Sequence, residues 1–149
     1  MDTFKQLKII FIALSSGQIV YFLISLILIM DEMVATNKDF NTVWGFVVPI
    51  VVVVLVVTSK LLYNYMINSK VKETSNEEKI IVYRTGNIIK FSLLEGANLI
   101  SITLFLLTGD FLYAGMFVIV MGIFFVNFPG KEKFMLEFGL SSFENNLNK

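Results

Sequence analysis

The sequence predicts an all-α membrane protein that forms a bundle of four transmembrane helices. Four apolar stretches, at residues 9–30, 43–63, 88–108 and 111–128, hold most of the 149-residue chain. Each stretch comes close to the ~20 residues that a helix needs to cross a bilayer. Hydrophobic residues make up 56% of the chain, whereas ~45–50% is typical of soluble domains. Few residues remain for a soluble domain, so we expect residues 1–149 to form a single membrane domain.

The apolar stretches are predicted to be helices rather than strands. The segment Val47–Val57 reads VVPIVVVVLVV and would be apolar on every face of a helix, as in helices buried in protein or lipid. Strands are usually shorter, at ~4–8 residues, and the strands of membrane barrels alternate in polarity. The first stretch also exceeds the ~7–15 residues of a signal-peptide core, which favours a retained span.

Basic residues gather on one side of the predicted bundle. Eleven of the twelve lie before the first span, in the facing ends of the second and third spans or between them, or after the fourth: Lys5, Lys8, Lys60, Lys70, Lys72, Lys79, Arg84, Lys90, Lys131, Lys133 and Lys149. The exception, Lys38, lies in the acidic segment 31–42. Because basic loops stay in the cytoplasm, we expect a multi-pass protein with both termini cytoplasmic.

The cytoplasmic connection at residues 64–87 is the longest polar segment, and we interpret it as a solvated connector. Ser75 and Glu78 have the spacing of a helix N-cap, and a helix starting there would run through Arg84 into the third span, with Gly86 as a weak point. The alternative role of this connection is contact with anionic lipid or with a cytoplasmic partner.

The cytoplasmic tail, residues 129–149, is predicted to be short and amphipathic. Pro129 and Gly130 end the fourth span. We expect a docked or interfacial tail: in the interfacial case the apolar side chains Phe134, Met135 and Phe138 would rest on the membrane surface, with neighbouring lysines reaching lipid headgroups.

A faint internal repeat relates the first span to the third. A shift of 79 residues aligns Gly17 with Gly96, Leu28 with Leu107, and Asp31 with Asp110. If the repeat is real, the fold consists of two parallel helical hairpins, a known membrane architecture. Chance similarity between leucine-rich helices is the other explanation.

Glu95 is the most deeply embedded charge in the predicted spans. It lies five residues past Lys90, which places it ~7–8 Å further into the membrane. Lys90 can extend outward to water. The shorter side chain of Glu95 has to face protein or a water-filled cavity, and an intramembrane carboxylate marks a candidate functional site.

Four polar residues are predicted to accompany Glu95. Ser92 and Asn98 flank it along the third span, and Ser15 and Gln18 of the first span should lie at a similar depth. Donation from Gln18 or Ser15 to Glu95 would create a polar seam between the two spans.

Three roles for Glu95 follow from this position. It binds a proton or a cation during coupled transport, it acts as a hydrogen-bond hub that holds the helices together, or it is ionised near the interface beside Lys90 or water. We favour the structural and interfacial roles, because the residue lies at a shallow depth.

The composition excludes several classes of chemistry. The chain has no cysteine and no histidine, which excludes disulfides, thiol catalysis and the usual zinc or haem ligation. We find no phosphate-binding loop and no nucleophile–base pair, and we expect no catalytic residue, cofactor, metal or nucleic-acid partner. An enzyme acting on lipids would need a polar cluster at the cytoplasmic face, which the sequence does not assemble.

The second half of the chain resembles small four-span bacterial membrane proteins whose activity is uncharacterised. The likeness rests on Arg84, on Leu94–Ala97, on Leu106–Gly109 and on Phe128–Lys133, and it implies a bacterial inner-membrane location. A looser likeness is to the proteolipids of rotary ATPases and to small multidrug exporters, which also carry one membrane glutamate. In those families the glutamate lies in the last or the first span, so neither activity transfers to Glu95.

The leading hypothesis is a non-enzymatic structural or accessory membrane component. Its partners would be the lipid bilayer and either a second copy of the chain or another membrane protein, because so small a bundle has little interior for a transport path. The alternative is a small proton- or cation-coupled transporter that uses Glu95.

Overall fold

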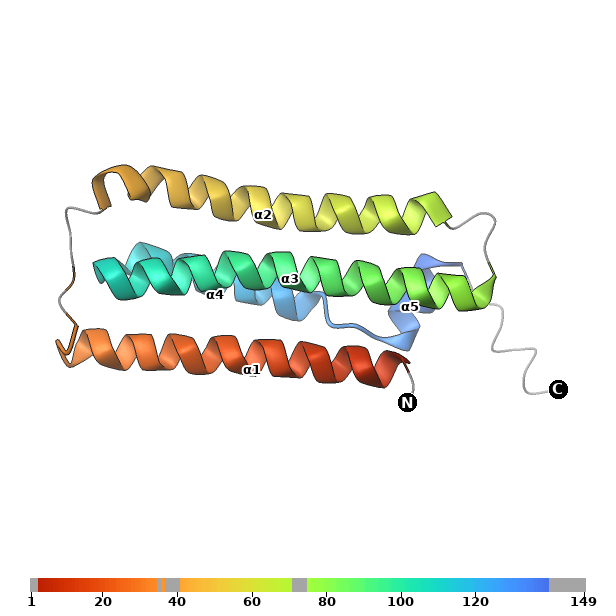
Figure 1. Cartoon of the computed structure of the whole chain (residues 1–149), viewed down its shortest axis with the longest axis horizontal. Helices are drawn as coiled ribbons and strands as arrows, with labels where there is room; N and C mark the ends of the chain where they lie inside the picture. The colour runs from red at the N-terminus through yellow and green to blue at the C-terminus, as the bar shows by residue number, and fades with distance from the viewer. Residues whose placement is uncertain (1–2, 35, 37–40, 71–74, 140–149) are drawn as a thin grey trace.

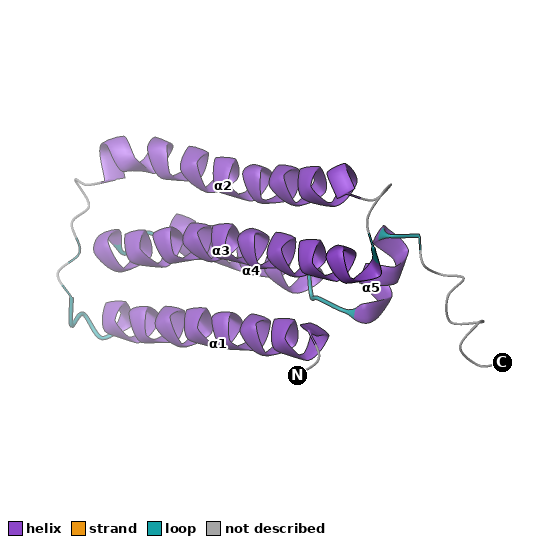
Figure 2. Cartoon of the chain, turned by 45° about the vertical axis from the view of Figure 1, so that its right-hand side comes forward, coloured by secondary structure: helices purple, strands orange, loops and turns teal. Residues whose placement is uncertain are grey.

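The computed structural model describes residues 3–34, 36, 41–70 and 75–139. These residues fold into five α-helices and contain no strand (Figures 1 and 2), which confirms the all-α prediction for this part of the chain. In order, the helices are α1 (Thr3–Met30), α2 (Asn41–Lys70), α3 (Asn76–Thr108), α4 (Phe111–Val126) and α5 (Lys131–Glu137).

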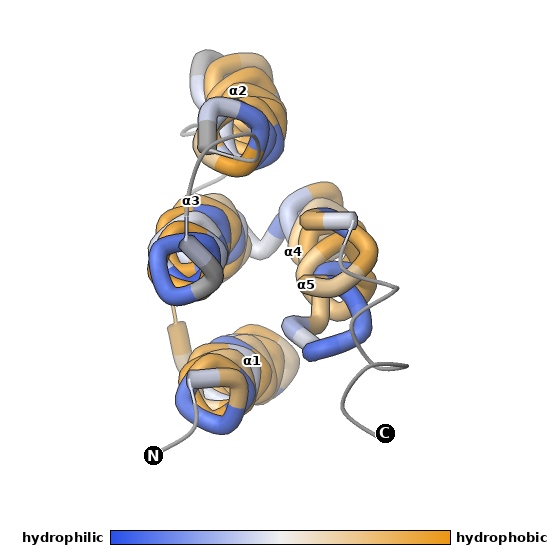
Figure 3. Tube along the Cα trace, turned by 90° about the vertical axis from the view of Figure 1, so that its right-hand side faces the viewer, coloured by the Kyte–Doolittle hydropathy of each residue, from blue (hydrophilic) through white to orange (hydrophobic). Residues whose placement is uncertain are grey.

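Helix α3 occupies the centre of the arrangement. Seen along the helix axes, α1 and α2 lie on opposite sides of α3, and α4 packs against a third side (Figure 3). The first two helices therefore do not form a packed hairpin, in contrast to the architecture expected from the repeat. The ten residues 31–40 separate α1 from α2, and a chain of that length reaches about 33 Å when extended.

Three helices, α1, α2 and α3, are long and apolar enough to cross a membrane. Helix α4 has 16 residues and spans about 24 Å, which is less than the ~30 Å of a bilayer core. The chain bends by 78° between α4 and α5, and this bent pair counts as a fourth candidate span only when it is taken together. The predicted fourth span is therefore shorter than expected.

The helices continue past the apolar stretches at the end where the N-terminus lies. Helix α2 runs to Lys70 and α3 begins at Asn76, so most of the predicted connection is helical. Ser75 is the N-cap of α3, and its side chain accepts a hydrogen bond from the backbone N–H of Glu78. This cap satisfies one of the free N–H groups of the first turn, as the sequence predicts.

A tight turn joins α3 to α4. Gly109 ends α3 with a left-handed φ of 67°, and its N–H donates to the carbonyl of Phe105 over 2.8 Å. Asp110 then caps α4 by accepting from the N–H of Leu112. Glycine tolerates the left-handed conformation without strain, and the short turn makes α3 and α4 antiparallel neighbours.

Aromatic rings build the main core between α1, α3 and α4. The ring of Phe11 stacks on Phe124 with centroids 4.6 Å apart and meets the edge of Phe91 at 5.3 Å. Further along α1, Phe22 stacks on Phe117 at 4.4 Å. These contacts hold α1 against α4 as well as against α3.

A second core lies at the end of the bundle that carries α5. It joins all the helices except α4 and consists of Leu7, Tyr63, Ile67, Tyr83, Phe134 and Phe138. Of the docked and interfacial alternatives for the tail, the positions of Phe134 and Phe138 agree with the docked one, because both side chains are buried in this core. The remainder of the tail, residues 140–149, lies outside the described residues.

Candidate functional site

A buried amide pair joins α1 to α3. The side-chain N–H of Asn98 donates to Oε1 of Gln18 over 2.5 Å, and both side chains are fully buried. One turn further along α1, the hydroxyls of Tyr21 and Thr103 lie 3.3 Å apart. A polar seam between the first and third predicted spans is therefore present in the structure.

Glu95 takes no part in this seam, although the sequence analysis placed it at the centre. Its side chain is partly exposed and makes no hydrogen bond or ion pair with a described residue. Each residue turns an α-helix by about 100°, so Ser92 and Asn98 point about 120° apart, and only Asn98 faces α1. Ser92 is exposed, and Ser15 donates to the carbonyl of Phe11 instead of to Glu95.

The amide pair is incompletely satisfied. Nε2 of Gln18 and Oδ1 of Asn98 are buried and find no hydrogen-bond partner among the described residues. We expect Asn98→Leu to lower the free energy of unfolding by about 1–2 kcal/mol, because it leaves the Gln18 amide buried without its partner.

The double variant Gln18→Leu/Asn98→Leu should be close to the wild type, since no unpaired amide then remains. Each single variant leaves one amide unpaired and the double variant leaves none, so unfolding of the four proteins in detergent should give a coupling energy of about 2–4 kcal/mol between the two positions. Strictly additive losses would show that the two amides contribute independently.

A second polar cluster surrounds a cavity at the end of the bundle that faces the viewer in Figure 3. The cavity has a volume of about 490 Å³ and lies between α2, α3, α4 and α5. Three lysines, Lys60, Lys90 and Lys133, line it together with the carboxylate of Glu137. We refer to it as the basic cavity.

Lys90 is the buried member of this cluster, with 5% of its surface exposed. Its Nζ lies 4.2 Å from the centroid of the Tyr63 ring, a cation–π distance. It makes no ion pair with a carboxylate among the described residues. From its position in the sequence Lys90 can reach outward to water, but in the structure the Tyr63 ring and α5 enclose it.

Gly86 permits this enclosure. A Cβ atom at Gly86 would lie only 3.2 Å from Cδ2 of Tyr63, which is closer than most Cβ atoms lie to a neighbouring side chain. The glycine therefore lets the Tyr63 ring pack against α3, one turn before Lys90. The predicted weak point of α3 is a continuous part of the helix with a packing role.

Helix α5 forms one wall of the basic cavity, and three side-chain contacts hold it there. The Tyr63 hydroxyl donates to the carboxylate of Glu137. The Tyr83 hydroxyl donates to the carbonyl of Gly130 over 3.2 Å. Nζ of Lys133 donates to Oδ1 of Asn127 over 3.5 Å, which ties α5 to the end of α4.

The chain was compared with known proteins at the level of families, curated sequences and solved structures. No family model, curated protein or solved structure matches it. The resemblance of its second half to small bacterial membrane proteins therefore stays an expectation. Glu95 and the two polar clusters are the features from which a function can be inferred.

The chemistry available at the basic cavity is anion binding. Ammonium groups donate strong hydrogen bonds to phosphate and carboxylate oxygens, and the lysines outnumber the acidic groups around this cavity by three to one. The described residues contain no group of three or more histidine, cysteine or carboxylate side chains that would hold a metal.

Sequence reasoning missed the basic cavity. Its residues come from four helices, and each lysine by itself is typical of a residue that flanks a span. One signal was available: Asn87 and Lys90 are polar residues one turn apart at the start of an apolar stretch. In the structure both are buried, and the Asn87 amide donates to the carbonyl of Tyr83.

Proposed function

We propose that the protein is a non-enzymatic structural or accessory component of a bacterial inner membrane. In this proposal α4 and the bend that follows it form a fourth span, and both termini face the cytoplasm. The three long apolar helices support the membrane location. The gathering of basic residues at one end supports the orientation.

The observation that carries the accessory role is the position of Glu95. It lies on one stripe of α3 with Ser92, Gly96 and Leu99, and both Ser92 and Leu99 are exposed. We refer to these four residues as the outer stripe. A carboxylate that faces lipid is costly, and a hydrogen-bond donor on a helix of another protein would offset that cost.

Gly96 favours such a contact. A Cβ atom built at Gly96 meets no other atom within 4 Å, so the backbone of α3 is open to close approach at this point. Small residues at helix surfaces permit this kind of packing in membranes. The proposed occupant of the outer stripe is therefore a transmembrane helix of a partner membrane protein.

Cysteine cross-linking in native membranes tests this proposal, because the chain contains no cysteine of its own. We expect Ser92→Cys and Leu99→Cys, each labelled with a benzophenone maleimide, to form a discrete adduct on illumination, because the excited benzophenone inserts into C–H bonds of a neighbouring chain and needs no second thiol. Val118→Cys is the control, since Val118 is 60% exposed on α4 and lies outside the outer stripe.

The adduct should depend on the hydrogen-bonding capacity of Glu95. We expect Glu95→Gln to retain it and Glu95→Ala to reduce it at least about fivefold, the equivalent of about 1 kcal/mol. An adduct of twice the chain mass would identify the occupant as a second copy. Equal cross-linking at all three cysteine positions would contradict a specific contact.

The alternative, coupled transport through Glu95, has less support from the geometry. Glu95 lines neither the basic cavity nor the apolar groove that lies between Val53 of α2 and Ile119 of α4. A transporter would require carbodiimide to label Glu95 at neutral pH and a transported cation to suppress that labelling.

A further inference from the structure

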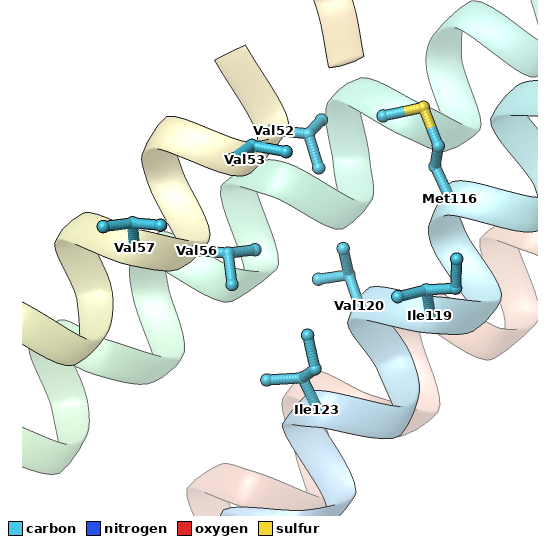
Figure 4. A pocket seen from close by; sticks show the side chains of 8 residues that line it. All are labelled: Val52, Val53, Val56, Val57, Met116, Ile119, Val120 and Ile123. Carbon is cyan, nitrogen blue, oxygen red and sulfur yellow. The ribbon is translucent and has the colours of Figure 1, made fainter. Parts of the chain in front are cut away.

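An apolar groove between α2 and α4 lies next to the basic cavity. The groove has a volume of about 200 Å³, and its walls are branched and sulfur-containing apolar side chains (Figure 4). Val56 of α2 and Ile123 of α4 line both the groove and the basic cavity. The two spaces therefore adjoin each other, one with charged walls and one with apolar walls.

The groove opens toward the surface of the membrane-spanning region. Ile119 is 66% exposed on α4, and Val53 and Val57 on the facing side of α2 are also exposed. Helix α2 packs against α3 and stands apart from α4 (Figure 3), so no helix among the described residues covers this side. A lipid acyl chain has direct access to the groove.

Lys90 is the second observation that points to a ligand. It is more than nine-tenths buried, lines the basic cavity, and has no carboxylate in ion-pair contact among the described residues. The one acidic group at the cavity, Glu137, accepts the Tyr63 hydroxyl and offsets only one of the three lysine charges. Burying an unpaired ammonium is unfavourable, and a bound anion would compensate the charge of Lys90.

We propose that the basic cavity and the adjoining groove together bind one anionic glycerophospholipid. Its phosphate lies among the ammonium groups of Lys60, Lys90 and Lys133, and one acyl chain follows the groove past Val56 and Ile123. A soluble anion would use the basic cavity and leave the groove empty. The adjacency of the two spaces and the exposure of the groove favour a lipid. The proposal requires a membrane location but is independent of the outer stripe.

The dimensions agree with this occupant. The basic cavity falls within the ~300–1,000 Å³ of typical ligand sites. Lys60 and Val52 on α2 are eight residues apart, which corresponds to about 12 Å along the helix. That length accommodates the first several carbons of an acyl chain below the phosphate. Basic sites between membrane helices are known to hold anionic headgroups.

Lipid binding to the purified full chain in detergent, measured by native mass spectrometry, tests the headgroup contact. We expect dioleoylphosphatidylglycerol to bind about tenfold more tightly than dioleoylphosphatidylcholine. Lys133→Gln and Lys90→Gln should each weaken binding about fivefold to tenfold. Lys131→Gln is the matched control, because Lys131 is exposed on α5 and does not line the cavity.

A pair of adjacent residues tests the acyl-chain contact. Ile119→Trp should fill the groove and weaken phosphatidylglycerol binding about fivefold. Val118→Trp should have no effect, since Val118 is equally exposed but lies outside the groove. The melting temperature of every variant is measured beside binding, and the two lysine variants keep the test decisive if a tryptophan variant fails to fold.

Three results would overturn the proposal. Equal binding of the two lipids, or an equal effect of Lys131→Gln and Lys133→Gln, would show that the basic cavity does not recognise the headgroup. Competition by millimolar inorganic phosphate together with unchanged binding in Ile119→Trp would show that the ligand is a soluble phosphate compound. Selective binding that is lost in the cavity and groove variants alone would support a lipid site.

Discussion

Phe11→Ala is expected to lower the free energy of unfolding by about 3–5 kcal/mol, the cost typical of deleting a buried phenylalanine ring. Phe11 is 2% exposed, and its ring contacts Phe91 on α3, Phe124 on α4 and Phe128 just beyond α4. Its removal creates a void at the point where three segments meet. Phe11→Ala should therefore weaken the packing of α1 against both neighbours.

Ile12→Ala is the control for this prediction, because Ile12 is the next residue along α1 and is 59% exposed. Its effect should remain within about 0.5 kcal/mol, as for most surface positions. Denaturant unfolding in micelles, followed by the fluorescence of the single tryptophan, Trp44, measures both variants. Similar losses in the two would mean that the Phe11 ring cluster does not hold α1 in place.

The helices could be predicted from the sequence because their signals are local. Unbroken apolar stretches indicate helices of membrane-spanning length, and the N-cap at Ser75 and the turn at Gly109 and Asp110 follow from side-chain and backbone preferences. Each of these features depends on residues a few positions apart. The structure agrees with them at α1, α2 and α3.

The arrangement of the helices could not be predicted in the same way. A helix that is apolar on all sides, such as α2 from Val47 to Val57, has no polar face to indicate which side its neighbours cover. The central position of α3 was indicated only weakly by the sequence. Its polar residues Asn87, Asn98 and Ser101 are all buried, as expected for a helix surrounded by others.

The candidate site likewise combines features that could be predicted from the sequence with features that could not. Gln18 and Asn98 meet because both lie at one depth, and depth can be counted along the sequence at 1.5 Å per residue. Glu95 lies only three residues from Asn98, yet its side chain points away from α1. That direction depends on how α3 is rotated about its own axis, which depth along the sequence does not fix. The basic cavity depends on the 78° bend after α4, which brings Lys133 and Glu137 beside Lys90.

Tyr83→Ala is expected to release α5 from the bundle. The ring of Tyr83 is fully buried and lies 5.2 Å from Phe134 and 6.1 Å from Phe4, and its hydroxyl donates to Gly130. Deleting an aromatic ring of this kind costs about 3–5 kcal/mol. Because α5 has seven residues, it is too short to remain helical without its packing contacts.

Hydrogen exchange measures this release. Amide exchange across Lys131–Glu137 should accelerate at least about tenfold in Tyr83→Ala, since local opening then costs less free energy. Tyr83→Phe removes only the hydroxyl and should cost about 0.5–1.5 kcal/mol. Ile81→Ala, at a position 61% exposed on the same helix, should change neither quantity. Unaltered exchange in Tyr83→Ala would show that other contacts hold α5.

The release of α5 also allows the headgroup contact and the acyl-chain contact of the proposed lipid site to be tested independently. Tyr83 does not line the basic cavity, so its loss acts on the cavity only through α5, which supplies Lys133 and Glu137. The apolar groove between α2 and α4 contains no residue of α5 and should stay intact. Tyr83→Ala should therefore reduce the preference for phosphatidylglycerol over phosphatidylcholine while both lipids still bind, because the headgroup contact is weakened and the acyl-chain contact is not.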